Sequence, residues 1–410
     1  MAFSDQVEGG NKILAVTGLA KLFGQRRDSE SRLEATVLQG DVKATVETGL
    51  DWKAGDKIAF LPTATQFKHT DYNEIASYDI NTGILKLVTP LNFYHWGASV
   101  STAAQYNGVD MRGEVIMLNR NVRIVGNDSD TWGGQVVVSD ILDITGAEFN
   151  GQLIIDSVEI YNCSQRNTFK SAIRFEGANT KQQSVTHSSI HGSWAWPLST
   201  QSASNVLVDS TTMVGGRAVG INILQSQNLI MNNLVVSDIM LRPELEMAHI
   251  IDKTACIDVC GYEEPTFGCS NITLTNSVVS GCDYAGFIVP GHTCGASATQ
   301  TVFKNNVAHS ISGAGALVFP DPTDVTQKDC YEVSHFSAYK NDEAGIDIQF
   351  LGDEIRANYV TLIDNTQGVS IQPTNPEEPN GPKQLSILQN SFIYGETLAQ
   401  DCPNKAYCYC

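Results

Sequence analysis

Short alternating runs of apolar and polar residues recur through the second half of the chain. Each copy has a β-branched strand, an Asn, Ser or Thr step, a second short strand, a turn, and a glycine that opens another strand, as in 272–289 and 302–318. Four late copies place this glycine 29, 30 and 23 residues apart, at Gly286, Gly315, Gly345 and Gly368. A repeat of this size predicts one coil of a β-solenoid.

The repeats predict a stacked parallel β-helix. Each strand alternates for only four to six residues and ends where the backbone turns tightly, so the chain changes direction without helices. Asparagines at the shared step are expected to form a ladder between coils: Asn232, Asn276, Asn305 and Asn390. We predict that strands starting near seven positions stack in one sheet: 206, 229, 272, 302, 333, 359 and 385.

Alternation alone is also compatible with a β-sandwich of short antiparallel strands. The fixed order of the repeat, and the lack of hairpin dipeptides such as Asn-Gly between its strands, favour the solenoid. The predicted fold class is therefore all-β, a right-handed parallel β-helix over residues 126–400. Residues 240–268 interrupt the repeat and are predicted to form a loop with one helical turn.

The N-terminal third carries antiparallel signals. Strand-like runs alternate with turns, of which Asn81-Thr82-Gly83 is typical of a hairpin. We predict a small antiparallel β module at about 34–97 within an N-terminal segment 1–125. The flanking stretches 9–24 and 117–125 are expected to belong to the coil stack.

Charge and hydropathy exclude two classes of partner. The chain has a formal charge of −19 and no basic cluster, which disfavours binding to nucleic acid. It has no run of 18 apolar residues, so direct membrane insertion of this segment is not expected. The expected partners are other extracellular protein segments or glycans.

Cysteines point to an oxidising compartment. Nine of the ten follow residue 250: Cys256, Cys260, Cys269, Cys282, Cys294, Cys330, Cys402, Cys408 and Cys410. Their spacings, C-x3-C, C-x8-C, C-x12-C and C-x11-C along the first five, fit no zinc knuckle. We therefore expect disulfides rather than zinc, with at least two among the first six. Residues 401–410 are interpreted as the Cys-rich start of a following segment.

Three Asn-x-Ser/Thr motifs agree with an extracellular setting: Asn127, Asn162 and Asn271 are candidates for glycosylation. The N-terminus has neither a basic region nor an apolar targeting region. The chain is therefore interpreted as an internal segment of a larger membrane-anchored or secreted polypeptide.

Other candidate groups have structural alternatives. His187 and His191 are four residues apart, but their local pattern predicts a strand, in which they would lie about 13 Å apart and share no metal ion. Asp209 is the single carboxylate expected at the asparagine step, so a pair of glycosidase carboxylates is not expected there. Trp194 and Trp196 are predicted on one face of a strand, where they either stack on sugar rings or pack under a loop.

No cofactor is predicted. The acidic runs 263–264, 321–324 and 377–378 offer carboxylates to Ca²⁺, but none has the spacing of a defined calcium loop. The turn around His292 faintly resembles the catalytic histidine turn of pectin-degrading β-helices, whose Asp triplet is missing here. A turn histidine without a catalytic role is the simpler interpretation.

Longer motifs carry a family resemblance. The run Trp52-Lys53-Ala54-Gly55-Asp56, with 91–97 and 113–122, resembles the region at and after the G8 domain. That domain is shared by fibrocystin, fibrocystin-like proteins, and hyaluronan-handling proteins of the cell-migration-inducing and transmembrane-hyaluronidase type. The runs 282–292 and 330–341 are similar to the fibrocystin branch. The resemblance implies a G8-type segment leading into a parallel β-helix, within a very large ectodomain at a cell or ciliary surface.

The same resemblance raises the question of catalysis. The hyaluronan-handling branch carries a His-Phe-His motif after the G8 segment, and the matching place here is Arg174-Phe175-Glu176. Arginine does not act as a base at neutral pH, and glutamate requires a tuned pKa. We therefore expect a non-catalytic chain.

Three functions stay open. The favoured one is a structural or adhesive segment of a large surface or ciliary glycoprotein. The others are a module that binds or cleaves carbohydrate, and a repeating unit of an extracellular filament joined through open strand edges.

Overall fold

The computed structural model describes residues 9–99, 106–127, 131–241, 254–260, 269–290, 292–293, 302–318, 330–349, 354–372 and 385–397. The regular elements in these residues are β-strands. No helix in this described part has the length and hydrophobicity to cross a membrane.

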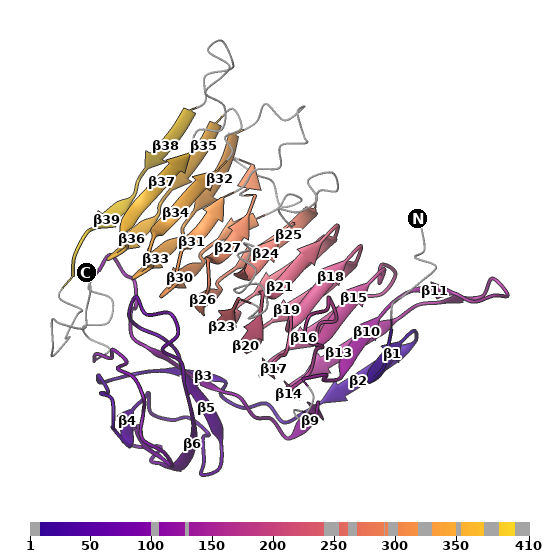
Figure 1. Cartoon of the computed structure of the whole chain (residues 1–410), viewed down its shortest axis with the longest axis horizontal. Helices are drawn as coiled ribbons and strands as arrows, with labels where there is room; N and C mark the ends of the chain where they lie inside the picture. Colours follow the sequence, from indigo (N-terminus) through magenta and orange to yellow (C-terminus); the bar gives the residue numbers. More distant parts are fainter. Residues whose placement is uncertain are drawn as a thin grey trace.

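Three parallel sheets run the length of the molecule and enclose one core (Figure 1). Sheet 1 contains, in spatial order, β1 (Ile13–Val16), β10 (Gln135–Val138), β15 (Ile173–Glu176), β18 (Leu198–Gln201), β21 (Val219–Leu224), β24 (Ala255–Val259), β27 (Ala285–Val289), β31 (Ala314–Val318), β34 (Ala344–Gln349) and β37 (Gln367–Gln372). Sheet 2 contains β2 (Leu19–Phe23), β13 (Gln152–Asp156), β16 (Gln183–Thr186), β19 (Ser204–Asp209), β22 (Gln227–Asn232), β25 (Ser270–Thr275), β29 (Val302–Lys304), β32 (Cys330–Ser334), β35 (Glu354–Asn358) and β38 (Leu385–Gln389).

Sheet 3 closes each coil. It contains β9 (Val122–Val125), β14 (Val158–Tyr161), β17 (Ser189–His191), β20 (Thr212–Arg217), β23 (Val235–Met240), β26 (Val278–Cys282), β30 (Val307–His309), β33 (Ser337–Tyr339), β36 (Thr361–Ile363) and β39 (Phe392–Tyr394). Three short strands form antiparallel pairs beside the three parallel ladders. The strand β28 (His292–Thr293) pairs antiparallel with β32, and β11 (Ile141–Leu142) forms a hairpin with β12 (Glu148–Phe149). The predicted all-β fold with a parallel β-helix is confirmed.

An antiparallel module interrupts the first coil between β2 and β9. Its strands are β3 (Glu30–Arg32), β4 (Lys43–Thr45), β5 (Lys57–Phe60), β6 (Asp71–Tyr78), β7 (Ile84–Leu87) and β8 (Glu114–Met117), in the spatial order β3-β8-β5-β6-β7-β4. On either side of this module, β1, β2 and β9 pair in parallel with β10, β13 and β14. The chain therefore leaves the coil stack, builds the module, and returns to complete the coil.

Six of the seven strand starts predicted for one sheet fall in sheet 2, and one is wrong. The predicted start at 359 lies in a turn, since the strand of sheet 2 in that coil is Glu354–Asn358, and Thr361–Ile363 belongs to sheet 3. Tyr359 has a φ of 53° and occupies the corner that Asn276 and Asn305 fill in earlier coils. Because the corner residue is a tyrosine, the apolar run of the sequence continues across the turn, and the pattern gives no sign that the strand ends there.

The prediction of a loop over 240–268 is wrong for Ala255–Val259, which form β24 in sheet 1. The register places Cys256 between Gly220 and Gly286, at the position that glycine takes in the neighbouring coils. The repeat therefore continues without its marker residue. The helical turn predicted near Glu244 lies outside the described residues.

The corner between sheets 2 and 3 is left-handed in every described coil after the first. Nine residues that are not glycine have φ between 47° and 59° there: Ser157, His187, Ser210, Asn233, Asn276, Asn305, His335, Tyr359 and Asn390. Side chains reinforce this corner, because Asn276 Nδ2 donates to Asn232 Oδ1 (2.8 Å) and Asn305 Nδ2 donates to Asn276 Oδ1 (3.3 Å). Asn390 instead donates to Asn358, at 3.0 Å. The predicted asparagine ladder is thus confirmed for Asn232, Asn276 and Asn305, with Asn232 one residue before its corner, and it is wrong for Asn390, which His335 and Tyr359 separate from the other three.

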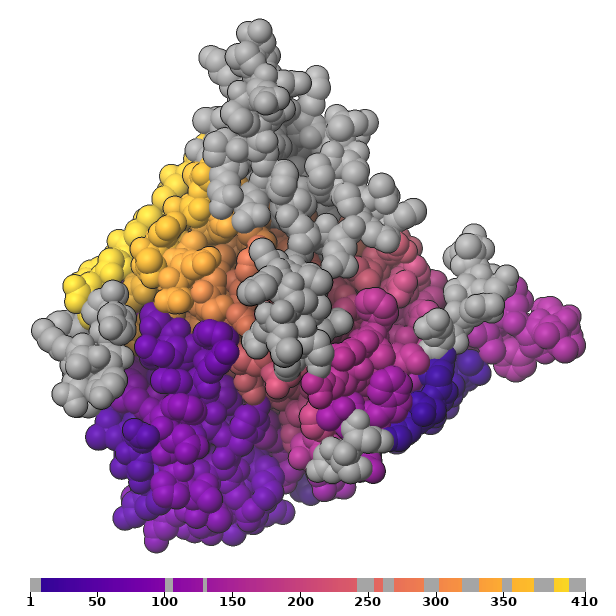
Figure 2. All heavy atoms as spheres, in the orientation of Figure 1, coloured from indigo at the N-terminus to yellow at the C-terminus, as the bar shows by residue number. Residues whose placement is uncertain are grey.

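The module packs on the outer face of sheet 3 (Figures 1 and 2). One apolar contact joins Leu61 and Ile116 of the module to Val214 and Val235 of the β-helix. A second joins Trp96, Val109 and Met111 to Tyr339 and Ile363. The two contacts involve coils at different positions along the axis of the β-helix. The module is therefore held against sheet 3 as a brace.

The register of sheet 1 aligns glycines in a column that contains Gly220, Gly286, Gly315, Gly345 and Gly368, and this glycine column generates a stability prediction. A Cβ on Gly315 would lie 2.7 Å from the carbonyl oxygen of Gly345, whereas a Cβ on Gly18 would meet nothing within 4 Å. We expect Gly315→Ala to lower the free energy of unfolding by about 1 to 3 kcal/mol, because overpacking forces neighbouring coils apart. Gly18→Ala is the matched control and should leave the denaturation midpoint unchanged. Equal midpoints for the two variants would contradict the close approach of the coils.

Candidate functional site

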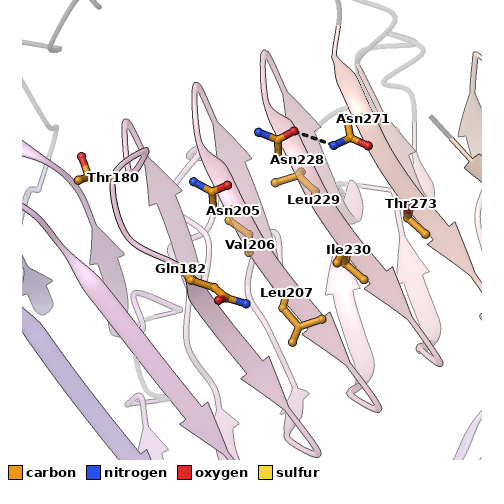
Figure 3. A pocket seen from close by; sticks show the side chains of 10 residues that line it. All are labelled: Thr180, Gln182, Asn205, Val206, Leu207, Asn228, Leu229, Ile230, Asn271 and Thr273. Atoms are coloured by element: carbon orange, nitrogen blue, oxygen red, sulfur yellow. Dashed lines mark hydrogen bonds between the residues drawn. The ribbon is translucent and has the colours of Figure 1, made fainter. Parts of the chain in front are cut away.

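A shallow groove of about 600 Å³ lies on the outer face of sheet 2 (Figure 3). It crosses the strands β19, β22 and β25 and reaches the turn before β16. Its lining residues are Thr180, Gln182, Asn205, Val206, Leu207, Asn228, Leu229, Ile230, Asn271 and Thr273. None of these ten carries a charge, so the groove is built from amides, hydroxyls and aliphatic carbon.

A row of asparagines forms one side of the groove. Asn205, Asn228 and Asn271 have φ of 62°, 56° and 52°, so a left-handed residue recurs at the same step of β19, β22 and β25. Asparagine tolerates this conformation better than other non-glycine residues. Asn271 Nδ2 donates to Asn228 Oδ1 at 2.7 Å, and Asn205 Nδ2 donates to the carbonyl oxygen of Asn179 at 3.1 Å.

Aliphatic side chains stand beside this row. Leu207 and Ile230 are register partners in adjacent strands, and the next strand continues the column with Thr273. Ile230 is 48% exposed. Amides next to exposed aliphatic carbon suit a neutral ligand with hydroxyl groups and an apolar face. The groove has no group for acid–base chemistry.

Arg174 and Glu176 lie on β15 in sheet 1, on a different side of the β-helix from the groove. Arg174 Nε is 3.2 Å from Glu176 Oε2, and the two side chains are 7% and 16% exposed. Arg174 and Glu176 stand at the positions matched to the two histidines of the His-Phe-His motif, and here their charges pair with each other.

The two histidines lie on either side of a corner, so the strand predicted to contain both is wrong. His187 has a φ of 47° between β16 and β17, and His191 ends β17. His187 Nδ1 is 3.1 Å from Asp156 Oδ1, whereas His191 Nε2 is 3.1 Å from Glu159 Oε1. Among the described residues, no cluster of three His, Cys, Asp or Glu side chains is arranged to hold a metal ion.

Asp209 ends β19, one residue before the corner at Ser210. Its Oδ1 accepts from Asn232 Nδ2 at 2.6 Å and its Oδ2 accepts from the Ser210 hydroxyl at 2.9 Å. The register neighbours of Asp209 in the adjacent coils are Thr186 and Asn232, neither of which is a carboxylate.

Trp194 and Trp196 lie in the turn between β17 and β18, so their predicted place on a strand is wrong. Trp196 is 8% exposed, packs with Ala218 and Val219, and meets the Phe169 ring edge-on at 5.7 Å. The ring of Trp196 is therefore used in packing.

Two disulfides form among the six cysteines for which at least two were predicted. Cys256 pairs with Cys282 and Cys260 pairs with Cys269, with Cα separations of 5.7 and 5.5 Å. Cys163 is a buried thiol, and burial raises its pKa to about 11. Cys330 begins β32, and four of the predicted disulfide candidates lie outside the described residues: Cys294, Cys402, Cys408 and Cys410.

The three glycosylation motifs have different surroundings. Asn162 is 7% exposed and is followed by Cys163 and Ser164, which are buried. Asn271 lines the groove. Asn127 is exposed, but the two residues that complete its motif lie outside the described residues. The three acidic runs considered for Ca²⁺ also lie outside them, and His292 is part of β28.

Sequence reasoning missed a buried group of charges between the module and sheet 3. Glu114 Oε1 accepts a hydrogen bond from Arg32 Nη1 and lies 3.3 Å from His309 Nε2, and His309 stacks on Tyr339 at a centroid distance of 4.5 Å. Burial alone would raise the pKa of Glu114, but the charges of Arg32 and His309 outweigh it and lower the pKa to about 2. Glu114 and His309 are 195 positions apart in the sequence, and no local pattern indicates that they meet.

Two more polar contacts extend this interface. Lys340 Nζ donates to the carbonyl oxygen of Thr63 at 3.1 Å, and burial lowers the Lys340 pKa to about 8 although Asp364 opposes the shift. The Tyr72 hydroxyl donates to Asp238 Oδ2 at 2.5 Å, and burial raises the pKa of Asp238.

The fold and this surface define the class: a parallel β-helix with a braced antiparallel module and an uncharged groove on one sheet. The chain is a distant homologue of fibrocystin and fibrocystin-L. It is 24% identical to fibrocystin of Canis lupus familiaris over 95% of this chain and 9% of that protein. It is 22% identical to human fibrocystin-L over 96% of this chain and 9% of that protein. The chain thus spans about a tenth of the length of these relatives.

Other comparisons are weaker. A G8 domain-containing protein of Dictyostelium discoideum is 24% identical over 28% of this chain and 7% of its own length. No family model matches. Among solved structures, the catalytic domain of a GH87 α-1,3-glucanase in complex with nigerose has a TM-score of 0.36 and 10% identity, covering 92% of this chain and 76% of that domain. The tailspike gp61 of Pseudomonas phage phi297 has a TM-score of 0.20 and 8% identity, covering 95% and 62%. Likenesses at these scores carry no functional argument.

The buried charges predict a pH-dependent loss of stability. A carboxyl with a lowered folded-state pKa stabilises the fold above its ordinary pKa of 4.5, and that stabilisation is lost as the pH falls toward 2. We expect Glu114→Gln to lower the free energy of unfolding by about 3 to 5 kcal/mol at pH 7, because Arg32 and His309 lose their buried partner. The difference in free energy of unfolding between the wild type and Glu114→Gln should be roughly 2 kcal/mol smaller at pH 3 than at pH 7.

Urea denaturation at both pH values measures this gap. Glu74→Gln is the control, because Glu74 pairs with Lys57 at the surface and both are more than a third exposed. That variant should change stability by less than about 1 kcal/mol at either pH. A Glu114→Gln gap that stays constant between pH 7 and pH 3 would contradict the assigned interaction.

Proposed function

We propose that this chain is a rigid, non-catalytic structural segment of an extracellular fibrocystin-like protein. The observation that carries the proposal is the brace: one module contacts coils from β20 to β36 through two apolar clusters and a buried set of charges. Such an interface resists pivoting of the module about the β-helix, because any rotation separates Glu114 from His309 and Lys340 from Thr63. Stiffness of this kind suits a spacer or a support for adhesion.

The disulfides support an extracellular setting, because such bonds persist in oxidising compartments and are rare in the cytosol. The homology to fibrocystin, which covers most of this chain, supports the same setting. A cell-surface or ciliary location, as an adhesive glycoprotein segment, follows by extension from those relatives and is part of the proposal.

The rigid-unit proposal is tested by following unfolding of the module and of the β-helix together. Trp52 and Trp96 are buried in the module region and Trp196 in the β-helix, so fluorescence of single-tryptophan variants reports on each part separately. We expect both probes and calorimetry to give one coincident transition. A separate transition for the module at lower denaturant, in a protein with both disulfides intact, would overturn the proposal.

The absence of hyaluronan cleavage is the second expected outcome. Acid–base groups contribute about 10² to 10⁴ in rate, and Arg174 and Glu176 are committed to each other. The formal charge of −19 also repels a polyanion. Long hyaluronan incubated with the chain, with and without Ca²⁺, should keep its length in size-exclusion chromatography. Shortening that disappears in Arg174→Ala or Glu176→Ala would reverse this conclusion.

Carbohydrate recognition is a second candidate function. The observation that favours it is the uncharged groove, where three asparagine amides stand beside exposed aliphatic carbon. A neutral glycan matches this surface better than a peptide with charged side chains or an acidic polysaccharide.

A further inference from the structure

We propose that Asn271 carries an N-linked glycan and that this glycan folds back along the groove on sheet 2, over Asn228 and Ile230. The inference rests on the proposed extracellular function, because such a glycan is attached only in a secretory compartment. It assigns the groove an occupant that is part of the same protein.

The strand geometry presents the acceptor motif outward. Asn271 and Thr273 are two residues apart in β25, and both side chains line the groove, whereas Ile272 between them is fully buried. Alternation along a strand puts residues two apart on the same face. The amide and the hydroxyl of the motif therefore point out of the β-helix together.

Asn162 offers a contrast within the same chain. The residue is 7% exposed, and the carbonyl oxygen of Asn162 lies close to Gly126 and Gly133, where little space remains. A glycan on Asn162 would require this corner to open, whereas a glycan on Asn271 extends over an existing surface.

The hydrogen bond of Asn271 is compatible with a glycan on the same amide. Its Nδ2 donates to Asn228 Oδ1 at 2.7 Å, toward the preceding coil (Figure 3). A glycosylated amide keeps one N–H, which is sufficient for this bond. The bond from the same nitrogen to the first sugar diverges from this N–H, so the sugar would begin at the edge of the groove beside Asn228, within reach of the other amides of the row.

The groove matches the chemistry of such a sugar. Its volume of about 600 Å³ lies within the range of typical ligand sites. Leu207 and Ile230 present aliphatic carbon to the apolar face of a pyranose ring, and the absence of charge among the ten lining residues suits a neutral N-acetylhexosamine. The glycan would remove Ile230, now 48% exposed, from water.

The test begins with the full chain secreted from eukaryotic cells and glycopeptide mass spectrometry. We expect Asn271 to be occupied and Asn162 to be unoccupied, and both Asn271→Gln and Thr273→Ala to remove the glycan. An unoccupied Asn271 in secreted protein with intact disulfides would overturn the inference.

The second arm measures release of the glycan by peptide N-glycosidase under native conditions. Ile230→Ser should keep full occupancy but speed release roughly tenfold, equivalent to about 1.4 kcal/mol of lost contact. Ile393→Ser is the control, because Ile393 is 52% exposed on sheet 3, away from the groove. Equal release rates for the wild type and Ile230→Ser would show that the glycan does not lie in the groove.

The experiments distinguish a failure of the rigid-unit proposal from a failure of the glycan proposal. Two unfolding transitions with Asn271 occupied would remove the rigid-unit function and leave the glycan in place. A single transition with Asn271 unoccupied would do the reverse. Binding of free N-acetylglucosamine oligomers to Asn271→Gln protein, combined with an unoccupied Asn271 in the wild type, would assign the groove to an external glycan and overturn the inference.

Discussion

Register between coils is the constraint on which the rest of this structure depends. The strands of the three sheets pair in parallel with those of the adjacent coils, so each coil must turn at the same register position as its neighbours. The corner between sheets 2 and 3 meets this requirement with left-handed residues that are not glycine, at a cost of order 1 kcal/mol each. Side-chain bonds between corners, such as that from Asn276 to Asn232, offset part of that cost.

The same constraint explains how much of the fold the sequence predicted. Corners filled by asparagine, and strands opened by glycine, reveal the repeat because these residues tolerate backbone positions that others avoid. The repeat could not be recognised in the sequence where another residue occupies the same position. Tyr359 stands at an asparagine corner, and Cys256 stands in the glycine column, so a strand start was misplaced in one case and a strand was missed in the other.

The candidate site was only partly predictable for a different reason. The sequence shows Asn271 as part of a glycosylation motif, but the groove also needs Asn228 and Asn205 from two earlier coils. The buried contact between Glu114 and His309 joins residues 195 positions apart. Local patterns predicted that the antiparallel module exists, but they contain no information on which coils it contacts. Buried charges then fix where the module docks, since a shifted position would leave Glu114 without a partner.

The cysteine in the glycine column has a mechanical consequence. Cys256 lies in sheet 1 and Cys282 in sheet 3, 26 positions later in the sequence, and the chain between them passes through sheet 2, so their bond closes nearly one whole coil into a covalent ring. Under tension along the chain, a solenoid unravels coil by coil from its ends as each ladder of hydrogen bonds opens. The ring cannot lengthen in this way. The ring therefore limits how far the middle of the stack can be extended. One coil also stays intact, and the strands of neighbouring coils can pair with it again when the tension is released.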